Sequence, residues 1–297
     1  MKLRRRRWPL LYLTLLPTFV LLAVFSYYPA INGIVRSFFD WHPGGESPFV
    51  WLENYGRMLT DDLWWGSFRN LGFIFVWSVT MMWVFPLIAA ELLVMLSTQR
   101  LRFVFRTLLL VPLAFPAVVN VLLWSFIYNP RDGMLNTFLR EVGLGFLAHN
   151  WVGDPDTALV ALLFVQFPWV ASLPFLVFSS ALEDIPKEVF EAAELDGAGR
   201  LRRFWHIDLP LMTQQFKLLL VLSIIGTLQY GLQAALVTGG GPDDATQVPV
   251  LKMISAAFNA NEWGYAATLS TTLFLLTLAI SGIALVMTKR GARDGVE

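Results

Sequence analysis

Six long apolar stretches constrain the fold of this chain more strongly than any other feature. Five of them, residues 8–35, 107–130, 157–182, 218–242 and 263–288, contain no Asp, Glu, Lys or Arg, and the sixth, residues 70–99, contains only Glu91. Each is longer than the roughly 20 residues that a helix needs to cross the hydrocarbon of a bilayer. Because a backbone in lipid must satisfy its own hydrogen bonds, each stretch is expected to be helical. The sequence therefore predicts an all-α integral membrane protein with six transmembrane helices, at residues 9–35, 70–97, 106–128, 157–182, 216–238 and 263–288.

The distribution of basic residues predicts the orientation of these helices. If the N-terminus is cytoplasmic, 16 of the 22 Lys and Arg residues fall on the cytoplasmic side. Cytoplasmic loops carry such an excess, so both termini and the loop 183–215 are expected inside. The first stretch is expected to be a retained helix, since no small-residue cleavage pattern follows it. Without internal repeats, residues 1–297 are expected to form a single transmembrane permease domain.

Motifs for catalysis, metal binding and nucleotide binding are absent from the sequence. There is no Cys and no Gly-Lys pair, so there is no P-loop, and neither a Gly-x-Ser-x-Gly nor a His-Glu-x-x-His motif occurs. His42, His149 and His206 have no metal-ligand spacing. The formal net charge of zero hides the uneven distribution of basic residues and is not evidence about partners. No nucleic-acid binding is implied. We therefore expect no catalytic residue, no metal site, no cofactor bound by this chain and no enzymatic activity.

The long inner loop has the pattern of two short helices. Pro186 fits the first turn of a helix, where its missing N–H costs nothing. The helix would carry an apolar stripe made of Ile185, Val189, Ala192 and Ala193. Asp196-Gly197 is expected to end it, because glycine readily adopts the left-handed conformation. A second helix over about 199–206 is expected to stop or kink at Pro210.

Leu201, Phe204 and Trp205, flanked by three Arg residues, are expected to form an apolar knob on this loop. Aromatic side chains and Arg are enriched where one protein docks into another. The same composition also suits a hairpin whose aromatic side chains lie among lipid headgroups. The residues by themselves leave both interpretations open.

The spacing of several loop residues adds a family resemblance. The pattern consists of Glu191-Ala192-Ala193, Gly197, Ile207 and Leu209-Pro210. It resembles the EAA loop of permease subunits in bacterial ABC importers, and the resemblance extends over nearly the whole chain. It is closest to the carbohydrate-uptake branch, with subunits similar to maltose, lactose and glycerol-phosphate permeases. Further matching stretches are Phe105-Arg106-Thr107, 116–119, Asn129-Pro130 with Gly133 and Asn136, Phe167-Pro168-Trp169, 238–242 and 264–267.

The resemblance implies a type I ABC importer permease in the bacterial inner membrane. Its expected partners are a second homologous permease subunit, two ATPase subunits that hold ATP and Mg, an external solute-binding protein, the sugar substrate and membrane lipid. Residues 239–242 and the first outer loop would face the binding protein. The loop would lie in a cleft of the ATPase dimer and transmit its closure. The positions expected to couple to the ATPase are Glu191, Ala192, Ala193, Asp196, Gly197, Ala198, Leu201, Phe204, Ile207, Leu209 and Pro210.

Uncharged polar and aromatic residues within the helices are candidates for the translocation path of a sugar. Rings stack on sugar faces and amides bond hydroxyls, although amides also join neighbouring helices and Trp often lies at the membrane interface. Gln229 and Gln233, four residues apart, are expected to share a helix face. The candidates are Asn120, Trp124, Gln166, Trp169, Thr227, Gln229, Tyr230 and Gln233.

Glu91 is the only ionisable residue within the six stretches. It can reach the interface or pair with Arg100 or Arg102, or it can act in gating or coupling. Kinks are expected at Pro116, Pro168 and Pro174, or these residues produce ordinary curvature.

The expected function is import of a sugar or oligosaccharide. The alternatives are a glycerol-phosphate or polyol importer subunit, an ion-coupled secondary transporter, or a membrane scaffold or sensor that recruits a soluble partner.

Overall fold

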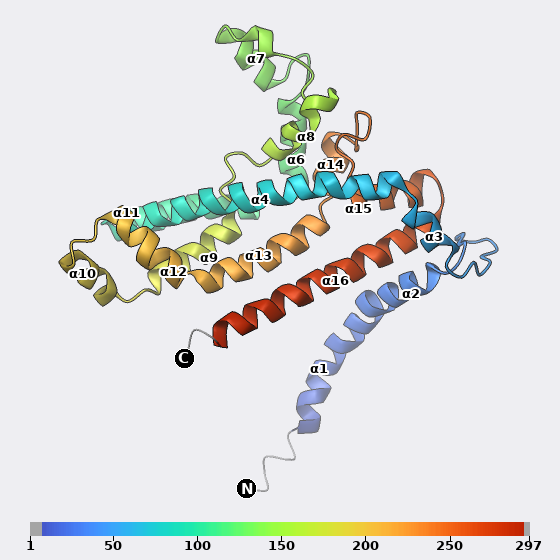
Figure 1. Cartoon of the computed structure of the whole chain (residues 1–297), viewed down its shortest axis with the longest axis horizontal. Helices are drawn as coiled ribbons and strands as arrows, with labels where there is room; N and C mark the ends of the chain where they lie inside the picture. Colours follow the sequence, from blue (N-terminus) through green and yellow to red (C-terminus); the bar gives the residue numbers. More distant parts are fainter. Residues whose placement is uncertain (1–7, 294–297) are drawn as a thin grey trace. The chain divides into compact units, whose positions relative to one another are not determined.

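The computed structural model describes residues 8–293, and within that range it is α-helical, with one isolated β-bridge between Phe39 and Phe49 as its only extended pairing (Figure 1). The all-α expectation is confirmed. The described residues form two compact units, 8–62 with 252–275 and 63–251 with 276–293. The basic residues before Trp8, on which the orientation partly depends, lie outside the described residues, and the orientation stays a prediction.

Three helical segments are long and apolar enough to cross a membrane, among the residues that the structure describes. They are Tyr12–Arg36, which includes α2 (Tyr28–Arg36), then α4 (Asp62–Val94), and Trp263–Val286 within α16 (Trp263–Arg293). These correspond to the first, second and sixth expected spans. α1 (Trp8–Leu22) precedes α2 through a π-helical turn at Ala23–Tyr27.

Two further expected spans are sharply bent. α5 (Gln99–Leu110) and the 3-10 turn Val111–Ala114 meet α6 (Ala117–Ile127) at 89°, with Pro116 at the N-cap of α6. The helical segment 200–211 meets α13 (Thr213–Leu228) at 65°. Five spans are present if each bent pair crosses the membrane as one span.

The expected helix over 157–182 is not continuous. α8 (Pro155–Phe164) and α9 (Ser172–Glu183) are separated by an irregular segment. Pro168 lies in the middle of this segment and has no N–H with which to continue a helix. Pro174 lies in the first turn of α9, where no kink is needed. The number of spans therefore stays a prediction.

The expected helix over 216–238 also breaks. α13 ends at Leu228, and α14 (Leu232–Val237) begins after Gly231. A Cβ at Gly231 would lie 2.5 Å from Cγ1 of Val250, so only glycine permits this close approach. A residue without a side chain also weakens a helix.

The core of the larger unit lies where α4, α9 and α13 run side by side (Figure 1). Its buried side chains come from all three helices and from the loop segments between α9 and α13. They are Leu87, Ala90, Leu93, Phe175, Phe178, Ala181, Leu182, Ile185, Met212 and Leu219. The Phe178 and Phe216 rings meet with centroids 5.0 Å apart.

The remaining helices are short. They are α3 (Glu53–Leu59), α7 (Met134–Glu141), α10 (Lys187–Leu195), α11 (Arg200–Arg203), α12 (Leu209–Leu211) and α15 (Pro249–Ile254).

In the smaller unit, α16 packs closely on the loop that follows α2. Thr268 Oγ1 donates to the carbonyl of Ser37 at 3.0 Å, and Tyr265 Oη donates to Asp61 at 2.6 Å. A Cβ on Gly264 would lie 2.1 Å from the carbonyl oxygen of Phe39. This contact needs glycine.

We predict that Gly264→Ala destabilises the protein by about 1–3 kcal/mol, because the methyl group would overlap backbone atoms that have no room to move. Thermal unfolding in detergent measures the effect as a lower Tm. Gly282→Ala on the same helix is the matched control, since its Cβ would meet nothing within 4 Å. An unchanged Tm for Gly264→Ala would contradict the packing described here.

Candidate functional site

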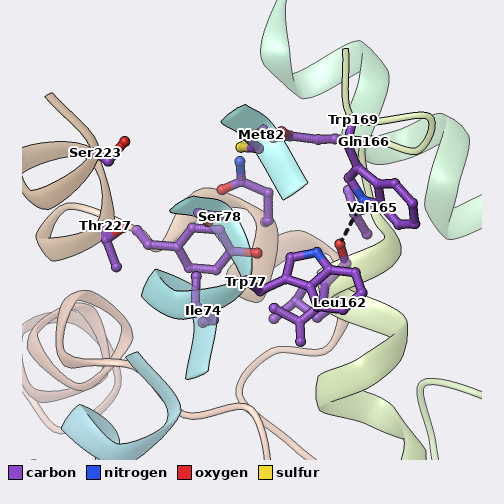
Figure 2. Close-up of a pocket in the computed structure, with 14 residues that line it drawn as sticks. Ile74, Trp77, Ser78, Met82, Leu162, Val165, Gln166, Trp169, Ser223 and Thr227 are labelled. Carbon is purple, nitrogen blue, oxygen red and sulfur yellow. Dashed lines mark hydrogen bonds between the residues drawn. The ribbon is translucent and has the colours of Figure 1, made fainter. Parts of the chain in front are cut away.

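A cavity of about 180 Å³ lies between α4, α13 and the segment that follows α8 (Figure 2). Aromatic, amide and hydroxyl side chains line it together with a few apolar ones. These residues are Ile74, Trp77, Ser78, Met82, Leu162, Leu163, Val165, Gln166, Trp169, Ser223, Gly226, Thr227, Tyr230 and Gln233.

A second cavity of about 320 Å³ adjoins the first on the side of α6. The two share the lining residues Met82, Gln166, Trp169 and Gln233, and the second adds Asn120 of α6. None of the residues that line either cavity is charged. The pair of cavities therefore presents a neutral, partly aromatic surface rich in hydrogen-bonding groups.

The irregular segment between α8 and α9 shapes both cavities. Gln166 and Trp169 have φ of 100° and 57°, a region that side-chain-bearing residues rarely adopt. Surrounding contacts hold this backbone: Trp169 Nε1 donates to the carbonyl of Leu163 at 3.2 Å (Figure 2), and its ring contacts those of Trp77 and Phe85. Such strained positions are concentrated at functional sites.

The structure brings most of the candidate path residues together. Six of the eight line the cavities: Asn120, Gln166, Trp169, Thr227, Tyr230 and Gln233. Trp124 lies outside the lining, and its ring contacts Tyr128 at 5.4 Å between centroids. Gln229 also lies outside, as an exposed residue at the end of α13. The expectation that Gln229 and Gln233 share a helix face is wrong, because the chain is not helical between them.

The contribution of α4 to the cavity was not predicted from the sequence. This helix supplies Trp77 and Ser78, and the Trp77 ring lies toward Leu162 and Trp169, on the side of α8 and the segment that follows it (Figure 2). Buried Trp77 Nε1 has no hydrogen-bond partner among the described residues. Such donors normally have one. In the sequence, the adjacent Trp77 and Ser78 within an apolar stretch were the feature that could have indicated this contribution of α4.

The inner loop forms the two short helices that its sequence predicts. α10 (Lys187–Leu195) ends at Asp196, and Gly197 has φ of 73°, which confirms the expected left-handed stop. Ala198 N donates to the carbonyl of Ala193 at 2.9 Å and Gly197 N to that of Glu194 at 3.0 Å. These two bonds form a Schellman motif, which fixes the turn after α10.

The second inner helix differs from its expected form. α11 (Arg200–Arg203) continues as a π-helical segment, Phe204–Asp208, into α12 (Leu209–Leu211). The helical segment ends at Leu211, one residue after Pro210, and meets α13 at 65°, so the expected stop or kink near Pro210 is confirmed. Proline is tolerated there because it lies near the start of α12, after a π turn has already altered the hydrogen-bond register.

The expected apolar knob is only partly exposed. Leu201 and Trp205 are 72% and 59% exposed, whereas Phe204 is half-buried and packs against the core. The outward-facing apolar residues thus include Leu201, Trp205 and also Leu195 of α10, which is 90% exposed. Of the other expected coupling residues, Glu191, Ala192, Asp196, Gly197 and Pro210 are exposed, Ala198, Ile207 and Leu209 are half-buried, and Ala193 is buried.

Glu91 pairs with neither Arg100 nor Arg102. Its Oε2 lies 3.4 Å from Nη2 of Arg203 on the inner loop. Arg102 instead donates to the carbonyls of Leu96 and Val94 at 2.6 and 2.8 Å, which caps the C-terminal end of α4. The tertiary fold brings a residue 112 positions away closer than the local arginines.

Comparisons with known proteins find a family model, curated relatives and solved structures that match this chain. The family model "Binding-protein-dependent transport system inner membrane component" matches residues 82–290. The probable ABC transporter permease protein YurN of Bacillus subtilis is 32% identical over 285 residues, covering 95% of this chain and 97% of that protein. The trehalose/maltose transport system permease protein MalF of Thermococcus litoralis is 31% identical over 284 residues, covering 94% of each. In fold, the chain matches a bacterial ABC transporter involved in the import of the acidic polysaccharide alginate, with a TM-score of 0.84, 20% identity and 96% coverage of both chains.

The cavity is predicted to admit water. Because the chain has no Cys, single cysteines can be introduced without background. We expect Gln233→Cys to react with a small hydrophilic thiol reagent in membranes, since Gln233 lines both cavities. Ala234→Cys is the control, because the neighbouring Ala234 is fully buried and should stay unlabelled. Equal labelling of the two, by mass spectrometry, would contradict the cavity.

Proposed function

Because the chain belongs to the family of binding-protein-dependent transport system inner membrane components, we propose that it is the permease subunit of an ABC importer that carries a neutral sugar or oligosaccharide. It is a multi-pass inner-membrane protein and a transport subunit, not an enzyme. The uncharged cavity between α4, α13 and the segment after α8 carries the proposal.

The chemistry of the cavity supports a sugar as the solute. Sugars offer hydroxyl groups for hydrogen bonds and C–H faces for aromatic rings. Gln166 and Gln233 supply amides, and Trp77 and Trp169 supply aromatic surfaces. One relative that is 31% identical is named as a trehalose/maltose permease and another of 31% identity as an sn-glycerol-3-phosphate permease, so the choice between these solutes rests on the cavity and not on the names of relatives.

A glycerol-phosphate solute fits this chain less well. A phosphate group needs basic side chains or backbone N–H groups to balance its charge, and neither cavity has a charged residue in its lining. Ion-coupled transport is also disfavoured, because Glu91, the one ionisable residue of the apolar stretches, pairs with Arg203.

We expect energy to enter through the inner loop, 183–215. The exposed Leu195, Leu201 and Trp205 would bind in a cleft of an ATPase dimer, whose subunits hold ATP and Mg. α10 and its fixed turn are stiff, so closure of the ATPase would displace the loop rather than deform it. A second homologous permease and an external solute-binding protein would complete the transporter, with access alternating between the two sides.

ATP-dependent uptake tests the proposal. Proteoliposomes would contain the chain, its partner permease and its ATPase, with the binding protein and a panel of labelled neutral sugars and glycerol 3-phosphate. We expect uptake of at least one neutral sugar that requires hydrolysable ATP and is insensitive to ionophores. Uptake that persists without ATP but requires an ion gradient would refute the importer assignment.

Leu201→Asp is predicted to reduce co-purification of the ATPase about tenfold or more, because a charge would replace an apolar anchor of the interface. Insertion of the protein should be normal, since Leu201 is exposed. Quantitative pull-down from detergent extracts measures the loss. Leu144→Asp, at an exposed leucine on a loop expected on the outer side, is the control. Equal recovery of the ATPase with both variants would argue against docking at this loop.

A further inference from the structure

Three ionisable side chains meet at the inner end of α4. Arg203 Nε lies 3.0 Å from Oδ2 of Asp208, and Arg203 Nη2 lies 3.4 Å from Oε2 of Glu91. Asp208 is fully buried and Glu91 is 7% exposed. Isolated surface ion pairs contribute little, whereas a buried pair becomes strongly unfavourable when one partner is removed. This cluster therefore attaches the inner loop to α4 at a defined place.

Arg203 joins three segments of the chain. Glu91 belongs to α4, Asp208 to the π-helical segment after α11, and the guanidinium also lies over the ring of Phe190 in α10, 4.8 Å from its centroid. A planar guanidinium can make directed hydrogen bonds at its edge and stack on an aromatic face at the same time. Both halves of the inner loop thus contact α4 through one side chain.

Among the residues that the structure describes, no second cation pairs with the two carboxylates. Glu91 Oε1 and Asp208 Oδ1 are buried without a hydrogen-bond partner among the described residues. The nearby arginines bind elsewhere: Arg102 caps α4, and Arg106 pairs with Glu183. Loss of Arg203 would leave two buried carboxyl groups without a counter-charge.

α4 connects this cluster with the cavity. It is one helix from Asp62 to Val94 and carries Glu91 near its inner end and Trp77, Ser78 and Met82 in the cavity lining. At 1.5 Å per residue, Glu91 lies roughly 20 Å along the axis from Ser78. Along the sequence the inner loop is attached only to α9 and α13. A hydrogen bond from Trp83 Nε1 to Ser223 Oγ at 3.2 Å joins α4 to α13 within the helices. Between α4 and the loop itself, the polar side-chain contact among the described residues is that of Glu91 with Arg203.

We propose that Arg203, held by Glu91 and Asp208, fastens the coupling loop to α4, so that displacement of the loop by the ATPase moves the wall of the cavity as well as α9 and α13. Arg203 is thus a positioning residue for transport, and this role rests on the proposed function. Apolar contacts alone would allow α4 and the loop to slide past each other, because such contacts have no direction.

The distance between α4 and the loop tests the fastening directly. Spin labels would be placed at Val76→Cys, on the exposed face of α4, and at Glu194→Cys, exposed on α10, in a chain that has no other cysteine. In lipid nanodiscs we expect one narrow distance distribution for the otherwise unchanged protein. Arg203→Met and Glu91→Leu should broaden it. Glu91→Leu removes only the contact with α4 and leaves the Arg203–Asp208 pair in place.

Transport measurements give the second readout. In the reconstituted transporter, both variants should still bind the ATPase, but the sugar taken up per ATP hydrolysed should fall at least fivefold. Arg203→Lys, which keeps the charge but loses the forked geometry, should lie between Arg203→Met and the unchanged protein in both measurements. Arg106→Met is the matched control, because it removes an ion pair on the same inner rim without touching the cluster.

A distribution in Glu91→Leu as narrow as that of the unchanged protein would overturn the fastening, as would loss of ATPase binding in that variant. If Arg203→Met fails to accumulate in membranes, the same distance measurement on Glu91→Leu tests the proposal. The distance measurement needs no ATPase, so it tests the contact between the loop and α4 independently of transport. Absence of ATP-driven uptake by the unchanged protein would refute only the proposed function.

Discussion

A backbone inside hydrocarbon must bond to itself, and this constraint explains both the helices of this chain and the places where they break. Irregular backbone at membrane depth is tolerated only where it is buried in protein or lines a cavity. The break between α8 and α9 places Val165, Gln166 and Trp169 in the cavity lining, and the break between α13 and α14 places Tyr230 there. The interruptions that would be unfavourable against lipid therefore form the site.

The same reasoning explains the one ionisable residue of the apolar stretches. A carboxylate within a membrane helix is costly unless it is paired. Glu91 meets Arg203, which lies in the loop that is proposed to contact the ATPase. α4 carries this residue at one end and cavity residues further along. One continuous helix thus links the proposed point of energy input to the proposed path of the solute.

Local signals predicted several features correctly. Gly197 ends α10 as expected, because a left-handed helix stop depends on a residue without Cβ and on its immediate neighbours. Three expected spans are also present as long apolar helical segments. They could be predicted locally because the backbone hydrogen bonds of a helix lie within the segment itself. Predictions that assumed helix continuity were less successful. Gln229 and Gln233 do not share a face, because Gly231 breaks the helix where Val250 approaches, and that approach is a tertiary contact.

The sequence by itself determined the membrane class, the all-α fold and the two-helix form of the inner loop, because hydropathy, charge asymmetry and glycine geometry act over short distances along the chain. Only the tertiary structure decided which side chains share a cavity, that Phe204 faces the core while Leu195 faces outward, and that Glu91 pairs with Arg203 rather than with Arg100 or Arg102. The contact between Glu91 and Arg203 joins residues 112 positions apart. The selection of such contacts depends on the packing of α4 against α9, α13 and the inner loop, which no local pattern specifies.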